Sequence, residues 1–518
     1  MILAAIGCCA SNRAAGLSSN PALADPAPRV KPSALRFEIG TNRKLIPDSV
    51  RGRLFVVLSR SAVPEPRMQI GITGMQTSPV IARDVVGFNF KTTMILNQSD
   101  ALFPLQSLSD LPVGEYFVQA LLQTNQDILV PDAPGNVFSH VVKARIDAGK
   151  GGTVKLTLDQ QLPADELPPD SGLVRFRKLR SERLSRFYGR PIYLRAGVIL
   201  PRGFDDSPAR RYPLRVQIGG FGTRYTIVRE LMKDDSEFRK AWLSDEMPRL
   251  VYLHLDGAGP LGDPYQINSA NHGPFGDAVT EELIPEIERE FHCVSRPQSR
   301  VVSGSSTGGW VALALQIFYP DFFNGAWAGY PDPVDFRAYE LIDIYSDENA
   351  YVNAMGFERP SARALNGDVQ FTVRHECQME NVLGSRNSYT MSGAQWGSWN
   401  AAFGPRDAEG RPVPLWDPLT GRINHQTAES WKRFDLRLVL QQNWPSLGPR
   451  LRGKLRIWVG EADDYFLNEG VHLLDDFLRQ ADPPAEARVE FGSRRRHGWE
   501  PHSETELMRE MMQAVSSE

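Results

Sequence analysis

The stretch Ser303-Gly-Ser-Ser-Thr-Gly-Gly-Trp310 decides how the second half of this chain is expected to fold. Residues 304–308 fit the pattern G-x-S-x-G, with Ser306 at the centre. A short apolar run, 300–303, precedes the pattern, and an apolar stretch of helical length, 310–318, follows it. In this strand, turn and helix context, the glycines let a serine be held in a strained turn above the edge of a sheet. Ser306 is therefore a candidate nucleophile, and the alternative is a glycine-rich turn with a solvated serine.

Apolar runs alternate with amphipathic stretches of helix length on both sides of this turn, from about residue 191 to residue 518. Such alternation is typical of a largely parallel sheet covered by helices. A long insertion rich in Asn, Trp, Gly and Pro, at about 339–449, is expected to form a cap that shapes a binding site. The expected strands are 193–200, 214–218, 250–255, 300–303, 325–329, 455–459 and 487–491, and the expected helices are 277–291, 308–318, 469–480 and 503–515.

The N-terminal part has a different pattern. Between residues 34 and 160, short runs with alternating apolar and polar residues are separated by turn residues, for example at 53–58, 114–120, 137–142 and 152–157. This spacing predicts a small all-β sandwich, an accessory domain. Residues 161–190 mix Pro, Asp and Arg without sustained periodicity, which is typical of a linker.

Length and composition limit the classes of protein. A chain of 518 residues is too long for one ordinary core, and 42% hydrophobic with 23% charged residues argues against both disorder and a fibrous repeat. The net charge of −4 includes no basic domain, so a nucleic-acid partner is not expected.

The first residues resemble the end of a bacterial lipoprotein signal. An apolar run ends in Ala5-Ile6-Gly7 before Cys8, and a loose polar segment follows it, so residues 1–33 are interpreted as a leader and tether. A lipid anchor through Cys8 and an exported location are expected, although the run has no Lys or Arg before it; the alternative is a disordered cytosolic N-terminus. Export would allow Cys293 and Cys377 to pair, but both are interpreted as buried packing residues.

A serine that attacks a carbonyl group needs donors for the oxyanion that develops during attack. Thr307 would offer its backbone N–H at the start of the helix after the turn. A second donor is expected after the strand 214–218, where the glycine-rich run 219–222 would let the N–H of Phe221 or Gly222 approach the substrate. A plain glycine turn at the end of the strand is the alternative there.

A serine hydroxyl also needs a base and a carboxylate, expected in the chain order Ser, acid, His. Of the candidate bases His472, His497 and His502, His497 follows the last expected strand in a loop and is preferred. His472 lies inside an expected helix and is disfavoured. His502 remains an alternative base, because it is expected to lie in a loop like that of His497.

The acid is expected just beyond the strand 455–459. Asp463 lies three residues after Gly460, where its carboxylate could bond the far nitrogen of His497 and fix the tautomer. Asp464 and Glu461 are rivals for this role, and a helix N-cap is the alternative for either aspartate.

Three stretches together give a resemblance to a known family. Asn271-His-Gly-Pro-Phe-Gly-Asp277 precedes an acidic helix, Tyr319-Pro-Asp-Phe-Phe323 follows the Ser306 turn, and Tyr330-Pro-Asp-Pro-Val-Asp-Phe336 comes next. From about residue 191 onward the chain resembles the putative esterase family of the α/β-hydrolase superfamily, which includes esterase D, feruloyl esterases, enterochelin esterases and mycolyltransferases. The resemblance implies an α/β-hydrolase fold and a triad of Ser306, Asp463 and His497.

Two other motifs are interpreted as coincidental. Gly257-Ala-Gly-Pro-Leu-Gly262 fits G-x-G-x-x-G, but Pro260 and the late start of the next helix disfavour a dinucleotide site. His375-Glu-Cys-Gln-Met-Glu380 lacks the i, i+4 histidine pair of a zinc protease and is interpreted as surface polarity of the cap. No cofactor and no metal are expected.

The sequence therefore predicts a serine carboxylic-ester hydrolase that acts on a small-molecule or carbohydrate-linked ester. Trp396, Trp399 and Trp416 of the insertion could stack on a sugar or a phenolic ester, or could form the core of the cap. Alternatives for the whole chain are a non-catalytic cell-surface binding or scaffold protein and an acyltransferase.

Overall fold

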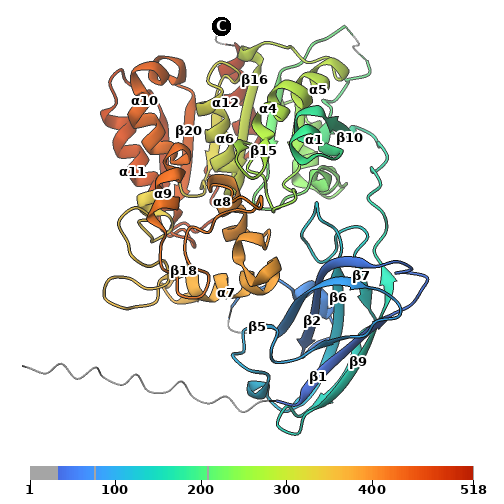
Figure 1. The fold of residues 1–518 in the computed structure, drawn as a ribbon. Helices are drawn as coiled ribbons and strands as arrows, with labels where there is room; N and C mark the ends of the chain where they lie inside the picture. Colours follow the sequence, from blue (N-terminus) through green and yellow to red (C-terminus); the bar gives the residue numbers. More distant parts are fainter. Residues whose placement is uncertain (1–32, 75–76, 207–208, 517–518) are drawn as a thin grey trace, which may run out of the picture.

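The computed structural model describes residues 33–74, 77–206 and 209–516 (Figure 1). The predicted leader with Cys8 lies outside these residues. The structure has two parts, an all-β part and a larger α/β part, which Figure 1 shows in blue to teal and in green to red.

The all-β part is one continuous nine-stranded sheet in the order β4-β1-β9-β7-β6-β2-β3-β5, with β8 paired to β6. β1 and β9 run parallel, and the other neighbouring strands are antiparallel. Alternate residues of β1, β2, β6 and β9 share one hydrophobic core, so the sheet curls around it. The strands are β1 (Leu35–Thr41), β2 (Val50–Ser59), β3 (Val80–Phe88), β4 (Met94–Leu96), β5 (Ala101–Phe103), β6 (Gly114–Gln123), β7 (Val137–Ser139), β8 (Val142–Ile146) and β9 (Gly152–Gln161).

The α/β part is built on an eight-stranded sheet in the order β10-β11-β13-β12-β16-β17-β20-β21. The first three strands pair antiparallel, and all later neighbours pair parallel. The seven strands predicted here from sequence are all present. The strands are β10 (Val174–Ser181), β11 (Ile192–Ile199), β12 (Leu214–Ile218), β13 (Val251–Leu255), β16 (Arg300–Ser305), β17 (Ala326–Gly329), β20 (Leu455–Gly460) and β21 (Arg488–Gly492), and two small hairpins add β14 (Asn268–Ser269) with β15 (Gly273–Pro274) and β18 (Pro360–Arg363) with β19 (Val369–Thr372).

Helices cover both faces of this sheet. The core on one face includes α5, α6, α10 and α11, and the core on the other includes α2, α3 and α12. A π-helical turn, Val279–Leu283, joins α4 to α5, so the helix predicted at 277–291 is continuous but not regular. The helices are α1 (Glu182–Tyr188), α2 (Val228–Leu231), α3 (Glu237–Leu243), α4 (Phe275–Ala278), α5 (Ile284–Glu290), α6 (Thr307–Phe318), α7 (Val373–Leu383), α8 (Gln395–Phe403), α9 (His425–Trp431), α10 (Leu436–Leu451), α11 (Leu467–Gln480) and α12 (Glu504–Ser516).

The linker predicted at 161–190 is wrong in its second half. Residues 174–181 form β10, which pairs with β11 along its whole length, and α1 follows directly. Val174 and Phe176 are buried on one side of the strand, but Lys178 and Arg180 follow on that same side and interrupt the apolar pattern. Ser181 also caps α1 by accepting a hydrogen bond from the N–H of Leu184. The α/β part therefore begins near residue 174.

The predicted cap insertion contains the β18–β19 hairpin and helices α7, α8 and α9, which Figure 1 shows at the lower end of the α/β part. Its last segment differs from the prediction, because α10 packs against α6 and belongs to the helical layer of the sheet. Cys293 and Cys377 are both buried and unpaired, which confirms them as packing residues. No helix in the described ranges is long and apolar enough to cross a membrane.

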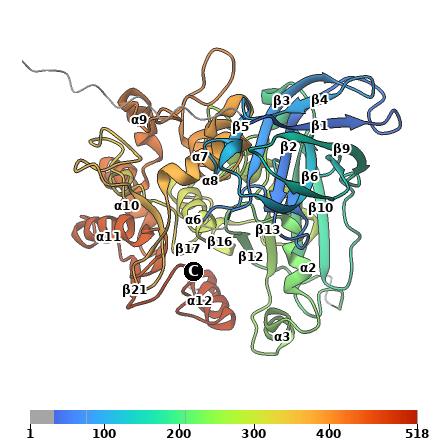
Figure 2. The ribbon, with the colours of Figure 1, turned by 90° about the horizontal axis from the view of Figure 1, so that it is seen from below.

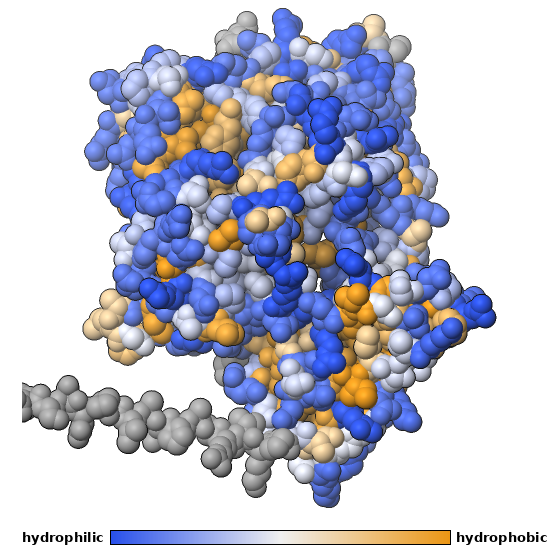
Figure 3. Space-filling view, viewed as in Figure 1, coloured by the Kyte–Doolittle hydropathy of each residue, from blue (hydrophilic) through white to orange (hydrophobic). Residues whose placement is uncertain are grey.

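The all-β part packs against the cap, and Figures 1 and 2 both show α7 beside β5. Met379 and Val382 of α7 share a small hydrophobic core with residues of β2, β3, β5 and β6. Arg53 of β2 is buried there and donates hydrogen bonds to the carbonyl of Val382 and the side chain of Asn387. Most of the face seen in Figure 3 is hydrophilic, with apolar side chains gathered over the all-β part and at the upper left, near α10 and α11. The two parts are thus joined by a packed interface.

Candidate active site

Ser306 lies in a sharp turn between β16 and α6, with φ 59° and ψ −126°. This positive φ is costly for a residue with a side chain and is tolerated where the surroundings require it. The turn is possible because two glycines allow close approach: a Cβ on Gly304 would lie 2.3 Å from the carbonyl oxygen of Gly308, and a Cβ on Gly308 would lie 2.3 Å from that of Ile218. The predicted strand, turn and helix context is present.

The structure brings Ser306, His497 and Asp463 into one hydrogen-bonded chain. His497 Nε2 lies 3.2 Å from Ser306 Oγ, and His497 Nδ1 lies 2.8 Å from Asp463 Oδ2. These distances are those of a base in contact with a nucleophile and of a carboxylate that orients the base.

The ends of two neighbouring parallel strands position the base and the acid. Asp463 follows β20, and its second oxygen accepts hydrogen bonds from the backbone N–H groups of Tyr465 and Leu467. His497 lies in the loop after β21, with its ring held between the ring edges of Tyr330 and Tyr465 at centroid distances of 4.7 and 5.0 Å. The Asp463 side chain is fully buried, so its hydrogen bonds fix its orientation.

The pKa of His497 is raised from its ordinary value of 6.5. Burial by itself lowers this pKa, but the hydrogen bond from His497 to Asp463 and the negative charges of Asp463, Asp332 and Asp464 outweigh burial. The imidazolium that forms when a serine is deprotonated is therefore stabilised at this site.

The rival bases and acids have other partners. His472 bonds Glu461 at 3.0 Å and stacks on Phe491, and His502 bonds Glu490 at 3.2 Å. Asp464 forms a two-pronged ion pair with Arg496 on the surface. None of these groups contacts Ser306 in the described structure.

The predicted oxyanion donors lie at the turn and in the loop after β12. The N–H groups of Thr307 and Phe221 donate no hydrogen bond within the described ranges, and Phe221 lines the same cavity as Ser306. The Gly222 N–H differs from the prediction, because it already donates to the buried Asp263 at 3.2 Å. Of the two residues predicted to supply the second oxyanion donor, Phe221 is therefore the one whose N–H is free to bind an oxyanion. The hydrogen bond from Gly222 to Asp263 holds the loop in place.

A cavity of about 390 Å³ opens on Ser306 and His497. The cap supplies much of its wall, and Gly71 and Thr73 of the all-β part line it as well. Of the three tryptophans that the sequence analysis named as possible substrate contacts, Trp399 is the one that lines this cavity. The indole N–H of Trp399 donates a hydrogen bond to Asp332. Trp396 and Trp416 are buried with their ring centroids 5.2 Å apart, so these two form core of the cap.

Several acidic residues of this cavity were missed by the sequence analysis. Asp332, after β17, accepts hydrogen bonds from the side chains of Tyr265 and Thr307, next to Ser306. Glu376 and Glu380 of α7 also line the cavity, so interpreting the stretch 375–380 as surface polarity was wrong. The available signal was their i, i+4 spacing, which places two carboxylates on one face of a helix.

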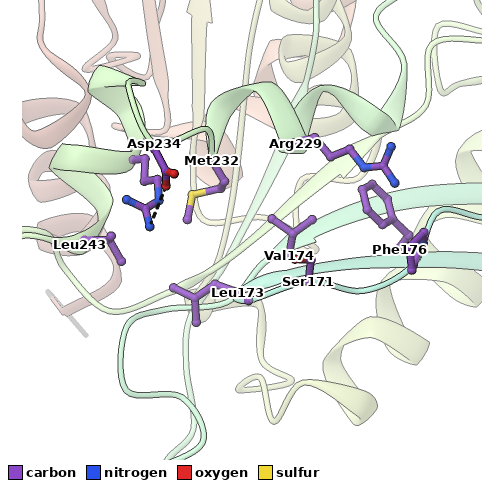
Figure 4. Close-up of a pocket in the computed structure, with 11 residues that line it drawn as sticks. Ser171, Leu173, Val174, Phe176, Arg229, Met232, Asp234 and Leu243 are labelled. Carbon is purple, nitrogen blue, oxygen red and sulfur yellow. Dashed lines mark ion pairs between the residues drawn. The ribbon is translucent and has the colours of Figure 1, made fainter.

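A larger cavity, of about 570 Å³, lies away from the triad (Figure 4). It is bounded by the start of β10 and by α2 and α3, with Leu173, Val174 and Met232 among its labelled walls and an ion pair between Asp234 and Arg239 at one side. Its lining residues include neither Ser306 nor His497, which both line the smaller cavity.

The G-x-G-x-x-G match at 257–262 gives no dinucleotide site. Residues 257–262 form a loop, and no helix begins before α4 at Phe275. In the described part of the chain, no group of three or more His, Cys, Asp or Glu side chains could hold a metal ion.

Comparison with solved structures gives matches of low similarity over about two thirds of the chain. A ferulic acid esterase is 16% identical, with 66% of this chain and 95% of that chain covered and a TM-score of 0.35. FphF, a fluorophosphonate-binding serine hydrolase of Staphylococcus aureus, is 13% identical, with 66% of this chain and 98% of that chain covered and a TM-score of 0.38. An S-formylglutathione hydrolase from Agrobacterium tumefaciens is 12% identical, with 67% of this chain and 96% of that chain covered and a TM-score of 0.36. No curated protein sequence matches.

The family comparison is more direct. The family model described as "Putative esterase" matches residues 194–469, more than half of the chain. The matched range holds the Ser306 turn and Asp463. The chain therefore belongs to the putative esterase family and is an esterase of α/β-hydrolase fold.

Proposed function

We propose that this protein is a serine carboxylic-ester hydrolase in which Ser306 is the nucleophile, His497 the base and Asp463 the acid that orients it. The observation that supports the proposal most is the unbroken chain of hydrogen bonds from Ser306 Oγ through His497 to Asp463, at the mouth of a cavity. Small-molecule esters, including carbohydrate-linked ones, are the proposed substrates.

The reaction proceeds in two halves. Ser306 Oγ attacks the ester carbonyl carbon while His497 Nε2 takes the hydroxyl proton, and the N–H groups of Thr307 and Phe221 stabilise the oxyanion. His497 then returns the proton to the leaving alkoxide, which departs as an alcohol and leaves an acyl-enzyme. Water, deprotonated by His497, attacks the acyl-enzyme, and the carboxylic acid is released with Ser306 restored.

Covalent labelling with a fluorophosphonate probe tests this proposal. A serine activated by a neighbouring histidine reacts with such a probe, whereas an ordinary serine does not. We expect one phosphonyl group per chain, located on Ser306 by peptide mass spectrometry, and loss of labelling after heat denaturation. Folded protein that stays unlabelled, or is labelled elsewhere, would contradict the assignment of the nucleophile.

Ester hydrolysis is expected to increase with pH through the raised pKa of His497. The base must be neutral to accept the serine proton, so kcat/KM falls as pH drops below that pKa. Because Asp463, Asp332 and Asp464 raise the pKa, the midpoint of the rise should lie above 6.5, the ordinary value for histidine. A pH profile of kcat/KM for an uncharged ester measures it, and a midpoint below 6.5 would contradict the role of these charges.

A further inference from the structure

The inner wall of the catalytic cavity carries three carboxyl groups, those of Glu340, Glu376 and Glu380, here called the carboxylate wall. Glu376 and Glu380 are one helical turn apart on α7, and Glu340 comes from the loop after β17. All three line the same cavity as Ser306 and His497. No step of ester hydrolysis described above uses them.

The wall has no positive charge to balance it. None of the three carboxylates forms an ion pair with Lys or Arg in the described ranges, and no Lys or Arg is among the residues that line the cavity. Glu380 accepts hydrogen bonds from the Ser392 hydroxyl and from the N–H groups of Trp396 and Gly397, and Glu376 accepts one from the Ser361 hydroxyl. These partners are neutral.

Glu340 is the least satisfied member of the wall. Its side chain is 3% exposed, and its Oε1 has only a long contact of 3.4 Å from the Ser361 hydroxyl. Its Oε2 is buried without any hydrogen-bond partner. The backbone at Glu340 also has a positive φ of 53°, so strain accompanies its position. Buried unpartnered acceptors and strained residues are rare, and they occur mainly at functional sites.

Burial raises the pKa of each carboxyl group, and the charge of Glu376 raises that of Glu340 and Glu380 further, the latter to about 8. A bound cation would restore the charged forms and supply the missing hydrogen bond. The lining combines these carboxyl groups with aromatic rings, so the cation that fits it best is an organic ammonium. Trp399 and Tyr465, which also line the cavity, offer the aromatic surface that alkylammonium ions prefer.

We propose that the carboxylate wall is a subsite for an alkylammonium group of the substrate, so that this enzyme favours esters with a protonated amine on the acyl or the alcohol side. The unpartnered Glu340 Oε2 accepts a hydrogen bond from the ammonium, and Ser306 reaches the ester carbonyl in the same cavity. This inference rests on the proposed serine-esterase function and adds a substrate class to it.

Matched pairs of esters test the inference. On the acyl side, 4-nitrophenyl 6-aminohexanoate is compared with 4-nitrophenyl heptanoate, in which a methyl group replaces the ammonium; on the alcohol side, 2-aminoethyl butyrate is compared with propyl butyrate. We expect kcat/KM to be about 10- to 100-fold higher for the charged ester of at least one pair, as charge-assisted hydrogen bonds allow. The pair that shows the preference identifies the side of the ester.

For the pair of esters that shows the preference, we compare the ratio of kcat/KM for the charged ester to kcat/KM for the neutral one. Glu340→Gln is expected to reduce this ratio at least about tenfold, because the amide keeps the shape of the side chain and loses its charge. Glu348→Gln is the matched control, the same change at an exposed position of the cap, and should keep the wild-type ratio. A ratio that Glu340→Gln leaves unchanged would overturn the assignment of Glu340.

Binding without turnover gives a second measurement. In the Ser306→Ala variant, butylammonium is expected to bind beside Trp399 and to change the tryptophan fluorescence saturably. Butanol and glucose at the same concentration are expected to leave the fluorescence unchanged. Glu340→Gln in that background should raise the Kd for butylammonium about tenfold or more. Saturable binding of glucose alone would instead show that the wall binds sugar hydroxyls, against the proposal.

The two proposals fail in different ways. If wild type is labelled at Ser306 and cleaves both members of each pair equally, the enzyme is a serine esterase and the wall is not a cation subsite. If neither ester is cleaved and Ser306 is not labelled, but butylammonium still binds the wall, the serine-esterase proposal fails and the cation subsite stands.

Discussion

Ser306→Ala is expected to lower kcat for 4-nitrophenyl ester hydrolysis about 10⁶-fold, because the nucleophile and the acyl-enzyme are both lost. The contact of 3.2 Å between Ser306 Oγ and His497 Nε2 is the reason for so large an effect. Residues that act as one unit are strongly non-additive, so His497→Ala and the Ser306→Ala, His497→Ala double variant should each lose about as much as Ser306→Ala alone. Initial rates at saturating substrate measure this.

Ser305→Ala is the matched control for the turn. The Ser305 hydroxyl donates to Glu500 and does not contact His497, so we expect a change in kcat of less than about tenfold. A Ser306→Ala variant that keeps more than about a hundredth of wild-type kcat, with a wild-type circular dichroism spectrum, would show that the nucleophile lies elsewhere.

Asp463→Asn should lower kcat about 10⁴-fold while leaving the fold intact. Asp463 Oδ2 accepts the hydrogen bond from His497 Nδ1 at 2.8 Å and so fixes the tautomer whose Nε2 can accept the serine proton. An amide can donate to Nδ1 instead, which favours the tautomer with its proton on Nε2. The variant also loses the main charge that raises the pKa of His497, so the residual activity should have a lower pH midpoint.

Asp464→Asn is the natural comparison, because Asp464 is the next residue and its carboxylate faces Arg496 at the surface. We expect its kcat to stay within about threefold of wild type, since exposed ion pairs contribute little. Equal losses in the two variants would contradict the assignment of Asp463 as the orienting acid.

The catalytic part of the fold was predictable because local signals agreed with one another there. The glycines around Ser306, the apolar strand before it and the buried helix after it all require the same turn, and Asp463 and His497 each follow an expected strand. The chain order of nucleophile, acid and base then left few choices. Contacts between residues far apart in the chain were not needed.

The parts that sequence analysis missed depend on such contacts. β10 has basic residues on both of its sides, so its apolar alternation is short, and only its pairing with β11 shows that it is a strand. The carboxylate wall was missed because a glutamate on a polar helix is usually solvated. Glu380 is buried because α7 packs against the start of α8, where the N–H groups of Trp396 and Gly397 donate to its carboxylate, and no local pattern reports that packing.

Gly71 and Thr73 have a consequence for how this enzyme can be divided. Because these two residues line the cavity, the substrate-binding surface is encoded in two separate regions of the gene. Excising the first 160 residues would remove one side of the binding site and uncover the apolar side chains of Met379 and Val382. The minimal active fragment is therefore larger than the matched family segment, and a chimera that exchanges the N-terminal region would change substrate selection together with stability.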